Sequence, residues 1–139
     1  MSLPVVLRDP ATEPFFDATA RGELLVRRCT ACGTHAAPPS DACPRCRNVT
    51  ATWEPAAGTG TVVSWTVVHG RTPGAEQVVA LVELTEGPWL YAALRGLRPG
   101  ERPRSGLPVT VAFERPEGGE AVPVFTPAVL TSAVLAPAV

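Results

Sequence analysis

Alternation of apolar and polar residues predicts a chain built mainly from short β-strands. Five segments in the second half alternate in this way, and turn-forming runs rich in glycine and proline separate them. The expected strands are residues 61–69, 77–84, 89–94, 107–114 and 121–126. Three closely connected strands followed by a longer connection predict a five-stranded Greek-key barrel of the OB type, which closes its own edges.

One helix is expected near the N-terminus, within residues 10–24. Its signals are Thr12 as cap, Pro14 in the first turn and Gly22 as a stop. The apolar positions at helical spacing are Phe15, Phe16, Thr19 and Ala20. A helix of about two turns is marginal alone, so its phenylalanines are expected to dock either on the barrel or on a partner protein.

Between the helix and the barrel, two further strands are expected, at residues 24–28 and 49–53, with an extended segment at residues 34–39. The predicted organisation is an N-terminal arm and helix (1–24), a small module (25–55), the barrel (56–127) and a C-terminal tail (128–139). The tail is uncharged and apolar. We expect it either to have no fixed structure or to strap onto a partner.

Every cysteine of the chain lies in the small module, in two C-x2-C pairs ten residues apart. A C-x2-C turn brings two thiolates to one point, and two such turns close a tetrahedral shell around a metal ion. Gly33 can adopt the positive φ such a turn needs, while Pro44 stiffens the second turn. The predicted ligands are Cys29, Cys32, Cys43 and Cys46.

Three other interpretations of the four thiols compete with structural zinc. Disulfides need an oxidising compartment, and the N-terminal residues have no cationic region or cleavage site of a signal peptide. A redox pair is expected in a thioredoxin-like setting and leaves the second pair unexplained. An iron centre with four thiolates fits the geometry as well. One structural zinc per chain is favoured, and four thiolates leave no open coordination position for catalysis.

Composition limits the function classes. The net charge is −1 and the pI is about 6.1, so no overall positive field attracts nucleic acid or anionic membranes. All 12 basic residues are arginine. No apolar run reaches the roughly 20 residues of a membrane span, and a cytoplasmic location is expected.

The order of the motifs resembles one known family. The carrying motifs are F-F at 15–16, L-L-V-R-R-C-T-A-C-G at 24–33, C-P-R-C at 43–46, G-T-G-T-V-V-S-W-T-V-V-H at 58–69, V-V-A-L-V-E-L-T-E-G at 78–87, G-L-P-V-T-V-A-F at 106–113 and V-P-V-F at 122–125. Together they are similar to the acyl-CoA-associated family with a rubredoxin-like zinc ribbon and an OB-fold, catalogued as domain of unknown function thirty-five. The chain departs from the family pattern in a longer, more basic loop at residues 95–106.

The resemblance implies a small non-catalytic subunit. Members of the family associate with a thiolase-like, ketosynthase-like or hydratase enzyme that acts on acyl-CoA or another acyl thioester. The expected role is therefore an auxiliary subunit of an acyltransferase, thiolase/aldolase-like or hydratase complex, in a hetero-oligomer. Direct contact with acyl-CoA is an additional expectation.

The residue content of the chain also argues against catalysis by this protein alone. Every thiol is assigned to the metal, and neither a G-x-S-x-G elbow nor a glycine-rich phosphate loop occurs. Trp65 and Trp89 are expected in the core, with stacking on an adenine as the alternative. The candidates for contact with CoA or a partner are His69, Arg71, Arg95, Arg98, Phe15 and Phe16.

Two other function classes remain as alternatives. Zinc ribbons and OB barrels also serve as modules that bind single-stranded nucleic acid, but such grooves combine a basic track with exposed aromatic residues. Here the arginines between residues 95 and 106 cluster in one loop, with an expected local charge of about +3 that suits phosphate or an acidic protein surface. The third hypothesis is a free acyl-CoA carrier, which predicts tight binding of CoA by the isolated chain.

Overall fold

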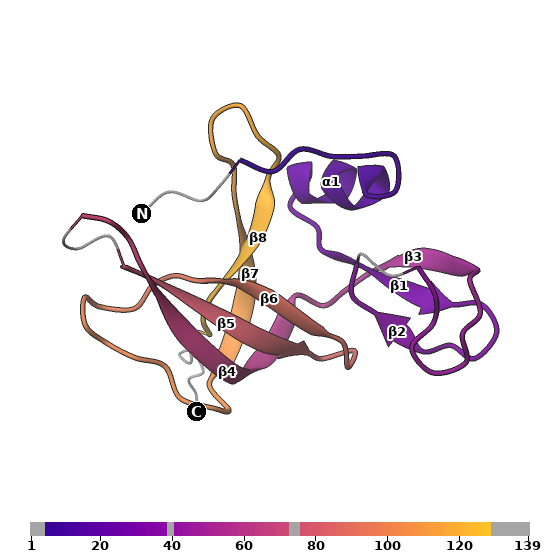
Figure 1. Cartoon of the computed structure of the whole chain (residues 1–139). Helices are drawn as coiled ribbons and strands as arrows, with labels where there is room; N and C mark the ends of the chain where they lie inside the picture. The colour runs from indigo at the N-terminus through magenta and orange to yellow at the C-terminus, as the bar shows by residue number, and fades with distance from the viewer. Residues whose placement is uncertain (1–4, 39–40, 73–75, 129–139) are drawn as a thin grey trace, which may run out of the picture.

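The computed structural model describes residues 5–38, 41–72 and 76–128 and is mainly β (Figure 1). A single short helix precedes eight strands in the described part of the chain. The elements are α1 (Glu13–Ala20), β1 (Leu25–Cys29), β2 (His35–Ala36), β3 (Ala51–Pro55), β4 (Thr59–His69), β5 (Glu76–Leu84), β6 (Trp89–Leu94), β7 (Pro108–Glu114) and β8 (Val122–Pro127). The C-terminal tail beyond residue 128, for which a strap on a partner was one expectation, lies outside the described residues.

Strands β4 to β8 form the expected closed barrel, in the order β4-β5-β6-β8-β7 with β7 returning to β4. The pairs are antiparallel except for β6 and β8, which meet in parallel at Leu94 and Phe125. This is the Greek-key connectivity of an OB-fold, so the prediction is confirmed. Each barrel strand begins and ends within two residues of its expected position.

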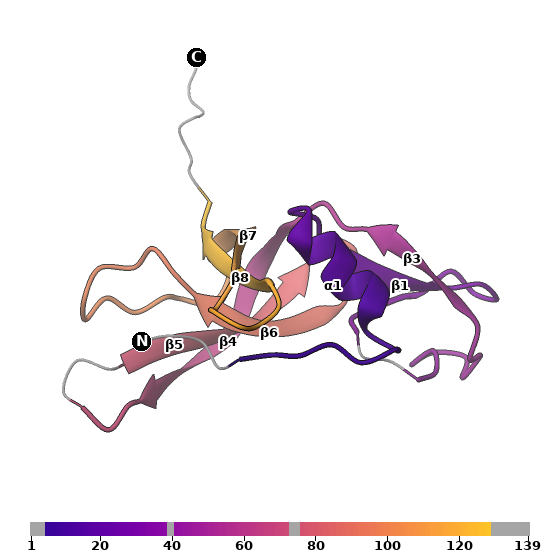
Figure 2. The same ribbon diagram turned by 90° about the horizontal axis from the view of Figure 1, so that it is seen from above.

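The small module is a three-stranded antiparallel sheet in the order β2-β1-β3. It lies at one end of the molecule, beside the barrel, and α1 covers the region where the two meet (Figures 1 and 2). The link to the barrel depends on Gly58, whose φ of 82° suits glycine and whose missing Cβ would lie 2.8 Å from Val111 Cγ1. This close approach fixes the angle at which the chain enters β4.

The structure confirms most of the sequence signals that predicted α1. Pro14 lies in the first turn. Gly22, with a φ of 82°, ends the helix, because its N–H bonds the Thr19 carbonyl while the next N–H, of Glu23, bonds Ala18. Thr12 is the cap residue, but its hydroxyl bonds Asp9 and not a helix N–H.

The two phenylalanines of α1 dock inside the chain. Phe15 and Phe16 each expose 8% of their surface, meet edge to face at 5.2 Å and belong to the same buried cluster as barrel residues such as Val62 and Phe125. This corrects the expectation that they contact CoA or anchor a partner, because burial removes both rings from the surface. Ala20 is exposed, so Ala18 takes its place on the buried face.

The core assignment of two tryptophans is wrong. Trp65 is 37% exposed and Trp89 is 54% exposed, and Tyr91 beside it on β6 reaches 72%. Trp89 is opposite Glu83 in the β5–β6 register, on the side of the sheet away from the buried Val82 and Leu84. Aromatic surface is therefore available on the outside of the barrel.

No helix among the described residues is long and apolar enough to pass through a bilayer.

Candidate metal centre

The four predicted ligands converge in the small module. The thiol sulfurs of Cys29, Cys32, Cys43 and Cys46 all lie within 4.8 Å of one another. Two sulfur pairs, Cys29–Cys46 and Cys32–Cys43, are 3.6 Å apart. A tetrahedral ion with metal–sulfur bonds of about 2.3 Å requires sulfur separations of roughly 3.8 Å. The donor set therefore fits a divalent cation held by four thiolates.

Two turns of the same construction present these ligands. In the first, the Cys29 N–H bonds the Thr34 carbonyl and the Gly33 N–H bonds the Cys29 carbonyl. In the second, the Cys43 N–H bonds the Asn48 carbonyl and the Arg47 N–H bonds the Cys43 carbonyl. The fourth residue after each leading cysteine has a positive φ, 77° at Gly33 and 69° at Arg47. Arg47 thus occupies, at some cost in backbone strain, the place that glycine fills in the first turn.

Hydrogen bonds to sulfur prepare the site for a cation. The N–H groups of Cys32 and Ala31, together with the Asn48 amide, lower the pKa of the Cys29 thiol to about 6. The hydroxyl of Thr34, 3.1 Å from the sulfur, lowers the pKa of Cys32.

The fourth thiol is affected in the opposite sense. Although the Asn48 N–H favours its thiolate, the pKa of Cys46 is raised to about 12, because the hydrogen bond shared with Cys29, followed by loss of solvent and by hydrogen bonds with Cys32 and Cys43, outweighs that N–H. Like charges in one site oppose full ionisation. A metal ion bound to all four sulfurs compensates this repulsion, and its binding releases the remaining proton.

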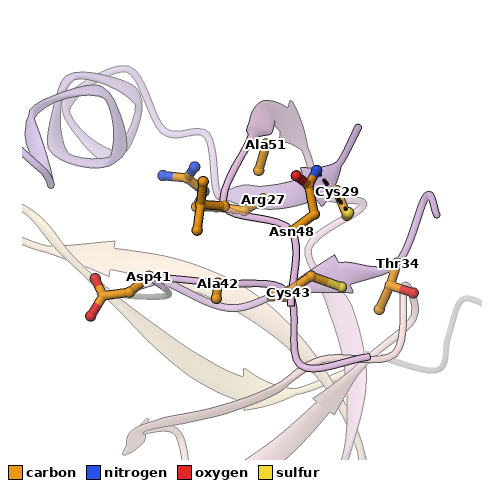
Figure 3. A pocket seen from close by; sticks show the side chains of 10 residues that line it. Arg27, Cys29, Thr34, Asp41, Ala42, Cys43, Asn48 and Ala51 are labelled. Carbon is orange, nitrogen blue, oxygen red and sulfur yellow. Dashed lines mark hydrogen bonds between the residues drawn. The ribbon is translucent and has the colours of Figure 1, made fainter. Parts of the chain in front are cut away.

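The crevice beside the two buried cysteines is too small for a substrate, whereas an open hollow of about 400 Å³ lies on the other side of the first turn, beside Cys29 and Cys32. Cys29 and Cys43 are buried and line a crevice of about 10 Å³ with Asn48 and Thr34 (Figure 3). That volume is at most about one water molecule. Because four thiolates would fill a tetrahedral shell, the donor set itself suits a structural ion with no open coordination position.

His35 stands apart from the sulfur cluster. Its Nε2 is 3.1 Å from Glu54 Oε1 on β3, and Arg28 Nη1 donates to the other oxygen of Glu54 at 3.3 Å. The His35 imidazole and the Arg28 guanidinium, in that order, lower the pKa of Glu54. The histidine thus ties β2 to β3 across the sheet.

Most of the remaining site candidates gather around a second hollow. This hollow has a volume of about 560 Å³ and lies between the start of β5 and the loop after β6; Arg95 and Arg98 line it. His69 joins its rim through Glu76, since Nδ1 of the histidine is 3.2 Å from Glu76 Oε2. Arg71 is exposed, and no ion pair is recorded for it among the described residues.

The arginines around this hollow are largely neutralised, which corrects the expected local charge of about +3. Arg95 forms two hydrogen bonds with Glu114, at 2.8 and 3.0 Å, and a third with Gln77. Arg102 pairs with Glu76 at 3.2 Å, and Arg98 faces Glu101 at 3.5 Å. Glu101 belongs to the loop, but Glu114 and Glu76 come from β7 and β5, so the composition of the loop alone overstated its attraction for phosphate.

We expect Arg95→Met to raise the pKa of Glu114 toward its ordinary value of 4.5, because hydrogen bonds from Arg95 are what lowers it. Since the pKa is depressed in the folded state, this pair stabilises the fold above the unfolded pKa and ceases to do so as the pH falls through the folded pKa. Carbon-13 NMR titration of the carboxyl groups between pH 2 and 7 measures the effect. Arg104→Met is the matched control, and an unchanged Glu114 titration in Arg95→Met contradicts the prediction.

Comparison with protein families gives two adjoining matches. Residues 16–50 match the model of the ChsH2 rubredoxin-like zinc ribbon domain, and residues 53–114 match that of the ChsH2 C-terminal OB-fold domain. Both models fall on the modules that the structure contains. The four-cysteine cluster lies within the first match.

Related proteins give the same pattern. A chain of the solved Ltp2-ChsH2(DUF35) aldolase is 36% identical, with a TM-score of 0.74, over 86% of this chain and 96% of that one. A curated protein of Thermomonospora curvata, a probable enoyl-CoA hydratase alpha subunit, is 40% identical over 129 residues; the chain spans only 40% of its length. A DUF35-family protein of unknown function from Sulfolobus solfataricus shares the fold at 18% identity, with a TM-score of 0.58 over 73% of this chain and 77% of that one.

Proposed function

Because the chain belongs to the family that joins a ChsH2-type zinc ribbon to an OB-fold domain, we propose that it is a non-catalytic accessory subunit of an acyl-thioester enzyme. The observation that carries the proposal is the 36% identity to a chain of the Ltp2-ChsH2(DUF35) aldolase, over 96% of that chain. The relative named as a probable enoyl-CoA hydratase alpha subunit supports acyl-CoA as the substrate class.

The site chemistry supports a structural role. The four thiolates saturate one metal ion, which we propose to be zinc, one per chain, with an iron centre as the alternative. Among the described residues, the two histidines each face a glutamate and neither faces a nucleophile. We therefore place the catalytic groups on the partner, and the protein in the cytoplasm, where thiolates stay reduced.

The proposed partner is a thiolase-like or ketosynthase-like enzyme, in a hetero-oligomer. An additional contact with acyl-CoA is best placed at the hollow beside Arg95 and Arg98, whose volume of about 560 Å³ is within the range of ligand pockets. Arg71 is the arginine near it that has no recorded carboxylate partner in the described chain. Since Arg95, Arg98 and Arg102, which line the hollow, are paired with carboxylates, binding of the protein partner comes before binding of CoA in this proposal.

Co-expression with the acyl-thioester enzyme encoded beside this chain tests the proposal. We expect the two proteins to elute together on size exclusion and the complex to turn over acyl-CoA faster than the enzyme alone. The isolated chain is expected to show no turnover and no tight binding of CoA. Separate elution, or turnover by the isolated chain, overturns the accessory role.

A second candidate function, binding of single-stranded nucleic acid, has one observation in its favour. Trp89 and Tyr91 lie exposed on β6, and β5 and β6 are the second and third strands of the barrel, which form the binding face in many OB-folds. The outward residues of β5 that accompany them include Glu83 and Gln77, with no arginine. An aromatic face without a basic track favours a protein partner over a polyanion.

Fluorescence anisotropy with labelled single-stranded DNA and RNA at physiological salt separates the two candidates. We expect no saturation at micromolar protein. Micromolar or tighter binding that weakens in Trp89→Ala would place nucleic-acid binding first.

A further inference from the structure

Strand β4 leaves one edge open beyond the point where the barrel closes. Its pairing with β7 covers only Thr59–Thr61, whereas its pairing with β5 runs on to His69. Beyond Val63, which accepts a bond from the Ser105 hydroxyl, β5 supplies all the recorded backbone partners of β4 in the described chain. The open edge, Ser64–His69, belongs to the β4–β5 hairpin that projects away from the ribbon and α1 (Figures 1 and 2).

The register identifies the backbone groups on this open edge. The Val63 carbonyl points away from β5, toward Ser105. In a trans peptide the following N–H points the opposite way, so the backbone N–H of Ser64 points toward β5. This agrees with the pairing of Ser64 with Leu81 after the bulge. Alternation then leaves the N–H and C=O groups of Trp65, Val67 and His69 directed outward.

Among the described residues, the β-bulge between Val62 and Ser64 lies just before this edge, and Ser64–His69 itself carries no further bulge. Strand β4 contains neither proline nor a charged side chain before His69, and six consecutive residues, Ser64 to His69, present the open ladder. Natural proteins normally protect such edges with charge, proline or bulges. Trp65 and Val68, on opposite faces of the strand, are 37% and 40% exposed, so a further strand would find apolar side chains on both sides.

Unpaired arginines stand at both ends of the edge. Arg71 lies two residues beyond His69, and Arg104 precedes Ser105, which bonds Val63. Both are exposed, and neither has an ion pair recorded with any described residue. The extended chain from Val63 to His69 spans roughly 20 Å, and Arg71 follows in a bend just beyond its end.

We propose that the open edge of β4 binds an extended strand of the partner enzyme, uncharged in its middle and acidic at both ends. The backbone ladder supplies affinity, and the two arginines select the register by meeting carboxylates. The identity of this partner rests on the proposed function.

Charge argues against a second copy of this chain as the occupant. An antiparallel self-pair centred on Val67 would place residue 71 of one copy opposite residue 63 of the other. Arg71 of one copy would then approach Arg104 of the other, because Arg104 precedes Ser105, which bonds the Val63 carbonyl. Such like-charge contacts oppose association, whereas a strand with acidic ends satisfies both arginines.

A peptide of stated sequence tests the edge without the partner. The probe is a nine-residue capped peptide, Asp-Thr-Val-Thr-Val-Thr-Val-Thr-Asp, added to the nitrogen-15-labelled full chain. We expect its largest amide shifts at Trp65, Val67 and His69. The same peptide with lysine at both ends is expected to bind about tenfold more weakly. Absence of shifts at these amides, or equal binding of the two peptides, overturns the proposal.

Variants of this chain test the edge proposal in the complex with the partner enzyme. Val67→Pro removes an N–H from the open edge while keeping the bonds to β5, and we expect it to weaken the complex at least about tenfold. Val67→Thr retains the N–H and is the matched control. Arg71→Glu with Arg104→Glu supplies a second variant that leaves the backbone intact, and it is expected to weaken binding as well.

The outcomes of the two arms separate the hypotheses. A wild-type chain that never binds the enzyme refutes the proposed function, and the peptide titration still decides whether the edge accepts a strand. A complex that forms equally well with wild type, folded Val67→Pro and the double arginine variant overturns the edge proposal and leaves the accessory role standing.

Discussion

Replacement of Cys43 with serine is expected to unfold the ribbon and release its metal. Cys43 is 7% exposed, accepts hydrogen bonds from the N–H groups of Arg45 and Cys46, and lies 3.6 Å from the Cys32 sulfur. A serine hydroxyl neither ionises at neutral pH nor bonds zinc as a thiolate does. One of four metal bonds is lost, and the remaining three thiolates repel one another.

The size of the effect follows from how little else holds the ribbon together. Its sheet consists of two five-residue strands and the two-residue β2, and the apolar residues buried near the cysteines are few. Structural zinc in small modules has an apparent binding free energy of about 10–16 kcal/mol, comparable to the stability of a whole domain. The metal centre therefore takes the place of a hydrophobic core in this module.

Elemental analysis and thermal unfolding followed by circular dichroism measure this prediction. Wild type is expected to hold about one zinc per chain and to lose ribbon structure with a strong chelator. Asp41→Asn, an exposed change in the same loop, is the control and should keep the metal. A Cys43→Ser chain that retains stoichiometric zinc and the wild-type transition contradicts the prediction, and iron with visible absorbance in wild type would change the identity of the ion.

The metal centre and the order of strands could be predicted because both depend on local patterns. Cysteine spacing alone brings Cys29, Cys32, Cys43 and Cys46 together, and alternation with turn residues fixes each barrel strand to within two residues. The parallel contact of β6 with β8, which completes the closed barrel, is a long-range pairing with no local signal. The spacing of strands and connections predicted a Greek-key barrel as a whole but not this individual pairing.

The exposure of the tryptophans could not be predicted from strand propensity. Trp65 lies on the same face of the sheet as its cross-strand partner Ala80, which is fully buried. Trp65, however, lies beyond Thr61, where the pairing of β4 with β7 ends and the barrel no longer covers that face. Trp89 faces outward because Leu90 and Leu94 point inward. In β5 both faces are apolar, so the sequence leaves the direction of the core ambiguous.

Distant partners explain the other differences. Arg95 pairs with Glu114 and Arg102 pairs with Glu76, and the partners of each pair are at least 19 residues apart in the sequence. The composition of the loop at residues 95–106 therefore could not show that these charges are balanced. Arg47, by contrast, had a usable signal. It follows Cys43 by the same four residues that separate Gly33 from Cys29, and the repeated turn places a positive φ there.

Replacement of Phe125 with alanine is expected to cost about 3–5 kcal/mol of folding free energy. Phe125 on β8 is 0% exposed and pairs with Val111 on one side and, in parallel, with Leu94 on the other. Its carbonyl also accepts the Arg95 N–H at 2.8 Å. The ring thus fills the core where β6 and β8 close the barrel, and its removal leaves a cavity that this closed sheet cannot easily collapse.

The same substitution tests whether ribbon and barrel unfold together. Phe16 of α1, Val26 of β1 and Phe125 belong to one buried cluster, so a cavity at Phe125 should lower a single transition shared by both modules, by roughly 10 °C or more. Calorimetry of the zinc-loaded protein measures it, with Tyr91→Ala as control because that side chain is 72% exposed. Two separate transitions, with only the barrel transition lowered, would show that α1 does not couple the modules.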